Sequence, residues 1–158
     1  MENYEQLLDI WRRSAIVMHI AHHKAAARCA TLHNFLGALV AGLSAAVASS
    51  IFISLSKSSD PFWLSITAIV SLGTAILTAA NSYLDFGGKS QRHYVSAVAF
   101  QSLRRELEEE LVRCRNGNPK DNYESVRDRW TSTLENSIPL PQRIHNKVKR
   151  NIDNEHKE

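Results

Sequence analysis

Two stretches without a charged residue decide the fold: Leu36–Leu55, LGALVAGLSAAVASSIFISL, and Phe62–Leu84, FWLSITAIVSLGTAILTAANSYL. Neither contains Asp, Glu, Lys, Arg or His over its 20 or 23 residues. A helix buried in a soluble bundle usually keeps a charged face toward water, so these runs favour lipid as their surroundings. As α-helices they would extend about 30 Å and about 35 Å, enough to cross the hydrocarbon core. The sequence therefore predicts an all-α, two-transmembrane helical hairpin. A soluble bundle around an apolar hairpin is the alternative.

Charges outside these stretches predict the orientation in the membrane. Lys24 and Arg28 precede the first stretch, and Lys89 and Arg92 follow the second, whereas the short connecting loop holds a single lysine offset by an aspartate. The positive-inside rule therefore places both termini in the cytosol. The N-terminus begins with polar and acidic residues rather than a basic stretch followed by an apolar run, so no cleavable signal peptide is expected.

Hydrophobic periodicity predicts long cytosolic helices on both sides of the hairpin. Residues 1–34 are expected to form an N-terminal helix that runs directly into the hairpin of residues 35–86, whose spans cover about 36–55 and 62–84. A glycine pair, Gly87 and Gly88, predicts a break before the second cytosolic part.

The second cytosolic part is a helical region over residues 87–142, followed by a polar tail over 143–158. One helix of this region has an apolar stripe that ends near Leu111, and a shorter helix around Trp130 begins at a capping box of Asp121 and Glu124. We expect the tail to be frayed, although its basic residues Lys147, Lys149 and Arg150 could touch anionic headgroups.

Hydroxyl and amide side chains follow one face of the second span. They recur at spacings of four, three, four and three, at Thr67, Ser71, Thr74, Thr78 and Asn81. In hydrocarbon an Asn side chain is costly unless it meets a partner or water, so this face points to protein or to a wet lumen. Two interpretations stay open. The residues either line a pore or, with small residues of the first span such as Gly42 and Ala45, let helices pack closely. One hairpin cannot enclose water, so the pore requires several copies around an axis.

Patterns typical of enzymes, metal sites and nucleic-acid binding are not found in the sequence. His19, His22, His23 and His33 have no carboxylate or cysteine nearby to complete a ligand set, so we expect no metal site and interpret them as packing or interfacial residues. No nucleophile has a base partner, and no cofactor motif is complete, so we expect no enzyme and no cofactor. The net charge of +3 is too small to favour nucleic acid as a partner.

The order of several short motifs resembles the SLATT family of two-transmembrane effectors. These motifs are Ala21–Arg28, Leu32–Gly37, Phe86–Lys89 with His93, Ala97 and Phe100, Leu103–Leu107, and Ile138–Pro141. The resemblance covers nearly the whole chain. It implies a membrane effector of bacterial antiphage conflict systems that acts beside nucleotide-generating or nucleotide-sensing partners, forms pores and halts or kills an infected cell. The family has no catalytic or ligand-binding motif that the resemblance could assign to residues of this sequence.

The sequence and the resemblance together lead to one functional hypothesis. We expect a homo-oligomeric pore that compromises the inner membrane when a nucleotide second messenger or a sensor protein triggers it. Its partners would be the lipid bilayer and further copies of itself. The cations near the inner boundary, Lys24, Arg28, Lys89 and Arg92, are the candidate contacts for lipid headgroups or for the phosphate of a signal molecule. The alternative is a non-conducting membrane scaffold that tethers a cytosolic partner.

Overall fold

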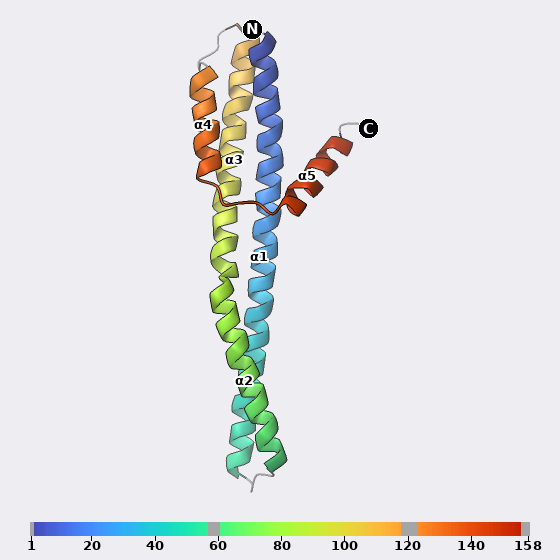
Figure 1. Cartoon of the computed structure of the whole chain (residues 1–158), viewed down its shortest axis with the longest axis vertical. Coiled ribbons are helices and arrows are strands. Elements are labelled where there is room, and N and C mark those ends of the chain that lie inside the picture. Colours follow the sequence, from blue (N-terminus) through green and yellow to red (C-terminus); the bar gives the residue numbers. More distant parts are fainter. Residues whose placement is uncertain (1, 57–60, 118–122, 156–158) are drawn as a thin grey trace. The chain divides into compact units, whose positions relative to one another are not determined.

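The computed structural model is all-α in the residues that it describes, which are 2–56, 61–117 and 123–155 (Figure 1). The helices are α1 (Glu2–Ser56), α2 (Pro61–Leu84), α3 (Phe86–Arg115), α4 (Tyr123–Glu135) and α5 (Gln142–Glu155). The turn residues expected at Lys57 and Asp60 lie outside the described residues, as does Asp121 of the expected capping box. Two of the helices, α1 and α2, contain segments that are long and apolar enough to cross a membrane. Both predicted spans are thus helical, with a length and an apolar composition sufficient to cross a membrane.

The long first helix confirms that the N-terminal helix runs directly into the first span. α1 continues from Glu2 to Ser56 without interruption. The junction around Ala25–Leu32 contains no proline or glycine and is rich in alanine, the residue with the highest helix propensity. Nothing in the local sequence therefore ends the helix where the charged part gives way to the uncharged part.

The break between α2 and α3 lies at Asp85, so the predicted break at Gly87 and Gly88 is wrong. Asp85 has a φ of 44°, in the left-handed region that Asp tolerates better than most residues. Its carboxylate accepts a hydrogen bond from the backbone N–H of Gly88 at 3.0 Å and thereby caps the first turn of α3. The two glycines instead allow other side chains to lie close to the backbone of α3. A Cβ at Gly88 would collide with the Asp85 carboxylate, and one at Gly87 would lie 3.3 Å from the His33 ring.

The helices fall into two compact units. Unit 1 comprises Met1–Arg28 and Lys89–Glu158, and unit 2 comprises Cys29–Gly88. The core of unit 1 lies where α1, α3 and α4 meet. Its buried members include Leu8, Phe100, Leu107 and Val126, and the half-buried Trp11 and Trp130 stack beside them with ring centroids 6.4 Å apart. The apolar stripe expected on α3 and the helix expected around Trp130 are both present.

The expectation of a frayed polar tail is wrong, because residues 142–155 form the helix α5. Ile144 and Val148 are buried against Ala21 and Ala25 of α1. Ile152 packs at the edge of the same cluster. These three apolar residues recur every four positions, so they form one stripe on an otherwise polar helix. The small alanines of α1 allow α5 to lie close to it.

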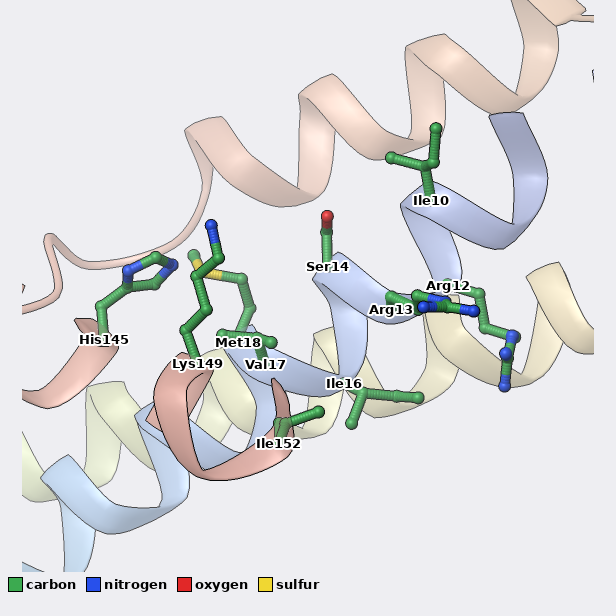
Figure 2. Close-up of a pocket in the computed structure, with 10 residues that line it drawn as sticks. All are labelled: Ile10, Arg12, Arg13, Ser14, Ile16, Val17, Met18, His145, Lys149 and Ile152. Carbon is green, nitrogen blue, oxygen red and sulfur yellow. The ribbon is translucent and has the colours of Figure 1, made fainter. Parts of the chain in front are cut away.

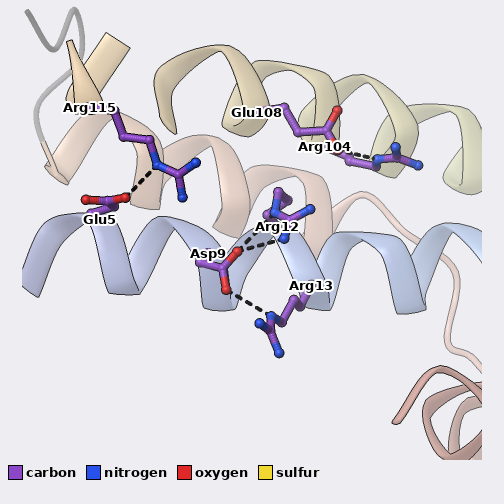
Figure 3. A network of polar contacts seen from close by, with 7 residues as sticks. All are labelled: Glu5, Asp9, Arg12, Arg13, Arg104, Glu108 and Arg115. Atoms are coloured by element: carbon purple, nitrogen blue, oxygen red, sulfur yellow. Dashed lines mark hydrogen bonds and ion pairs between the residues drawn. The ribbon is translucent and has the colours of Figure 1, made fainter. Parts of the chain in front are cut away.

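Ion pairs join helices at the surface of unit 1 (Figure 3). Arg115 of α3 donates from Nε to Glu5 of α1 at 2.6 Å, while Arg104 and Glu108 pair along α3 at 2.8 Å. All four side chains are more than a third exposed, and such pairs contribute at most about 1 kcal/mol each. The apolar core, rather than these pairs, must therefore hold unit 1 together.

Candidate functional site

The polar face of α2 is turned toward α1 within the hairpin. Thr74 is the one buried residue of α2, with 9% of its surface exposed, and Thr67, Ser71 and Asn81 are half-buried, whereas Thr78 is exposed. Thr67 Oγ1 lies 3.3 Å from Ser50 Oγ of α1, which fixes the direction of this face. The structure therefore brings four of the five predicted residues to the contact between the two helices.

The threonine hydroxyls of this face are satisfied by their own helix. Thr67, Thr74 and Thr78 each donate to the backbone carbonyl four residues earlier, at 2.9, 2.8 and 2.9 Å. This bond spares a hydroxyl the cost of an unpaired donor in an apolar environment. The closed hairpin can therefore hold these side chains without water.

Asn81 differs from the hydroxyl residues of the face. Its Oδ1 is inaccessible to solvent and has no hydrogen-bond partner among the described residues. A buried amide oxygen without a partner costs about 1–3 kcal/mol, so it usually meets a water or another polar group. Asn81 is thus the member of the face with the strongest physical demand for a further polar contact.

A lateral groove of about 620 Å³ runs beside the hairpin contact. It is lined by residues of both helices, including Ser44 and Val47 of α1 and Ser71, Thr74 and Thr78 of α2. Part of the polar face is therefore accessible from one side of the hairpin, even though the two helices are packed.

The first span contacts α2 through a different face from the one that carries its small residues. The half-buried positions of α1 recur at spacings of four and three, at Leu36, Val40, Leu43, Val47 and Ser50. Ala38, Gly42, Ala45, Ala46 and Ser49 are exposed, and a Cβ on Gly42 would meet no atom within 4 Å. Within one chain, these small residues do not mediate the packing of the hairpin.

The four cations predicted as phosphate contacts lie on α1 and α3 of unit 1. Lys24, Arg28, Lys89 and Arg92 are all exposed. The Ser90 hydroxyl donates to the Ala26 carbonyl at 2.9 Å, which places the two helix segments side by side. The structure therefore places the four cations around one level of the α1–α3 pair.

A histidine pair is buried between α1 and α3, and the sequence did not reveal this pairing. His22 is fully buried and His93 is 5% exposed, and their Nδ1 atoms are 3.1 Å apart. Only one Nδ1 can carry the proton of this bond, because two N–H groups cannot face each other at that distance. His22 Nε2 has no hydrogen-bond partner among the described residues, and its ring stacks on Phe100.

Burial controls the protonation of this pair. Desolvation, with a smaller contribution from the charge of His93, lowers the pKa of His22 to about 4. Burial likewise lowers the pKa of His93. Both rings are therefore neutral at pH 7, as suits a packing role. The spacing of His93 from Ala97 and Phe100 was the signal that could have placed it on the buried face of α3.

His19 and His23, which lie near this pair, form no metal site with it among the described residues. His19 Nδ1 lies 3.0 Å from the Ala97 carbonyl, and its ring stacks on that of His23 with centroids 6.3 Å apart. Across the described parts of the chain, no group of three or more His, Cys, Asp or Glu residues is placed to hold a metal ion.

One family model matches the chain, over residues 4–139, which include both candidate spans and the helices α3 and α4. Its description is SMODS and SLOG-associating 2TM effector domain family 4, one of the SLATT families, and this family is associated with nucleotide-signalling conflict systems. No curated protein and no solved structure matches the chain. The match covers most of the sequence and agrees with two apolar helices of spanning length in an all-α fold. This chain is therefore a membrane protein that belongs to the SLATT family of two-transmembrane effector domains.

Proposed function

We propose that the protein is an effector of bacterial antiphage defence that forms a gated oligomeric pore in the inner membrane, with both termini in the cytosol. The packed hairpin would be the closed arrangement. A nucleotide signal or a sensor partner that binds unit 1 would favour a second arrangement, in which the polar face of α2 borders water. Such a trigger has to bind one arrangement more tightly than the other to shift their populations.

One observation carries the proposal: a continuous polar face lies on a span that contains no charge. Thr67, Ser71, Thr74 and Asn81 meet α1, and Thr78 lies beside the lateral groove. Hydroxyls that bond to their own backbone in a dry contact can exchange those bonds for water when the contact opens. The unpartnered Oδ1 of Asn81 would gain a hydrogen bond in the open form, which makes it the residue that most favours opening.

The test replaces hydroxyls of this face and measures leakage. Thr74→Leu with Thr78→Leu should abolish dye release from vesicles and toxicity in cells, because it makes the proposed lining apolar. Thr74→Val with Thr78→Val removes the same hydroxyls without adding bulk, and should reduce leakage while leaving the oligomer intact. Ser65→Leu changes an exposed hydroxyl on the opposite face of α2 and serves as the matched control.

Two outcomes would contradict the pore. Unchanged leakage in both double variants would mean that these residues do not line the path. Absence of any permeability change in the wild-type protein, together with activity that survives exchange of both spans for unrelated ones, would instead support a membrane scaffold that tethers a partner through unit 1.

A further inference from the structure

A groove of about 510 Å³ lies between α1 and α5 in unit 1 (Figure 2). This volume is within the usual range of about 300–1,000 Å³ for small-molecule sites. Apolar side chains from both helices line it, together with a serine, a histidine and three cationic groups. The lining residues are Ile10, Arg12, Arg13, Ser14, Ile16, Val17, Met18, His145, Lys149 and Ile152.

The charges around the groove favour an anion. None of the lining residues is a carboxylate. The nearby Asp9 binds Nε and Nη2 of Arg12 but only Nε of Arg13, at 2.9 Å (Figure 3). The terminal nitrogens of Arg13 and the Lys149 ammonium take part in no ion pair or hydrogen bond within the part of the chain that the structure describes. A guanidinium end and an ammonium are thus available to a ligand.

These cations stand on different walls of the groove. Arg13 belongs to α1 and Lys149 to α5, and Figure 2 shows them at separate places along the groove, with Ser14 between them. One phosphodiester, as in a phosphatidylglycerol headgroup, supplies a single charge and would satisfy one of them. A small molecule with two or more negative charges can satisfy both. The apolar side chains of Ile10 and Met18 offer contact to a ring or hydrocarbon portion of the same molecule.

We propose that this groove binds a soluble organic phosphate with at least two negative charges and an apolar ring, such as a nucleoside diphosphate. This inference rests on the proposed function, because it assigns a place for the trigger. Such a ligand would bridge α1 and α5 next to the contact of Ile144 and Val148 with α1. α5 is then the element whose position on α1 depends on the ligand.

Binding is measured on the full chain in phosphatidylcholine nanodiscs, with the fluorescent probe mant-ADP and with pyrophosphate as a competitor. Arg13→Gln and Lys149→Gln should each weaken mant-ADP binding about tenfold, which corresponds to about 1.4 kcal/mol. Arg150→Gln removes the adjacent exposed charge on the same helix and should change the affinity by less than about twofold. Asp9→Asn should tighten binding, because it releases both arginines from their carboxylate.

The following results would overturn the inference. Failure of mant-ADP to bind, or an equal loss in Arg150→Gln, would mean that the groove is not a site for this class of ligand. Displacement of the probe by phosphatidylglycerol added to the nanodiscs would identify a lipid as the occupant. Leakage is recorded separately. If the wild-type protein causes leakage but binds no probe, the nucleotide site is contradicted and the pore is not. If it binds the probe without causing leakage, the pore is contradicted and the nucleotide site is not.

Discussion

Acidification should destabilise unit 1 through the buried histidine pair. The pKa of His22 is lowered from 6.5 to about 4 in the folded protein, chiefly by burial. The unfolded chain therefore binds more protons than the folded chain between these two values. The stability that His22 contributes is fully present above pH 6.5 and is lost as the pH falls toward 4.

The size of the effect follows from the two pKa values. A difference of one unit corresponds to about 1.4 kcal/mol, so the full shift from 6.5 to about 4 is worth roughly 3 kcal/mol. At pH 5 the linkage relation gives a loss of roughly 2 kcal/mol relative to pH 7.5. His93, whose pKa is lowered by the same burial, acts in the same direction.

The assay is reversible unfolding in detergent, followed by the fluorescence of Trp11 and Trp130 after Trp63→Phe has removed the signal of unit 2. The free energy of unfolding is measured from pH 7.5 to pH 5 for the wild type and for His22→Phe, which keeps a ring and cannot titrate. His23→Gln, at an exposed position one residue along α1, is the matched control. An unchanged pH slope in His22→Phe, or a wild type that gains stability on acidification, would refute the reasoning.

Three further predictions concern packing. Phe100→Ala should cost about 3–5 kcal/mol in the same unfolding assay, because the side chain is fully buried between His22 and Trp130, whereas Val98→Ala on the exposed face of α3 should cost less than about 1 kcal/mol. Ala25→Leu should release α5, because it inserts bulk beneath Ile144 and Val148 at a cost of about 1–3 kcal/mol. Faster tryptic cleavage at Lys147 would report that release, and equal acceleration by the exposed Ala27→Leu would contradict it. Gly88→Ala should lower the midpoint of thermal unfolding relative to Gly37→Ala, because its Cβ would displace the Asp85 carboxylate that caps α3, whereas a Cβ at Gly37 meets open space.

Local patterns predicted the helices because their signals lie within short stretches. The charge-free runs gave the two candidate spans, and the three-and-four spacing of Phe100, Leu103 and Leu107 gave the buried face of α3. α5 was missed because Ile144, Val148 and Ile152 are separated by charged residues, so the segment is polar on average although its stripe is apolar. The turn was predicted at Gly87 and Gly88 rather than at Asp85 because glycines commonly break helices. Here the two glycines instead leave room for the Asp85 carboxylate and the His33 ring.

The candidate sites depended on relations that no single stretch contains. The spacing of the polar residues on α2 placed them on one face, but the direction of that face became known only from the contact of Thr67 with Ser50. The pairing of His22 with His93 joins residues 71 positions apart and requires the register between α1 and α3. The groove beside Lys149 exists only because α5 packs on α1.

The proposed pore requires that lipid surrounds the hairpin formed by α1 and α2. A spin label on α2 tests this directly. Ile76 is 60% exposed and faces away from the polar residues. The labels are introduced in a Cys29→Ala, Cys114→Ala variant that is reconstituted in vesicles. A label at Ile76→Cys should collide more often with oxygen than with a water-soluble nickel chelate. A label at Val112→Cys in unit 1 should collide more often with the chelate than with oxygen. A label at position 76 that the chelate reaches freely, or that neither reagent reaches, would contradict the membrane hairpin.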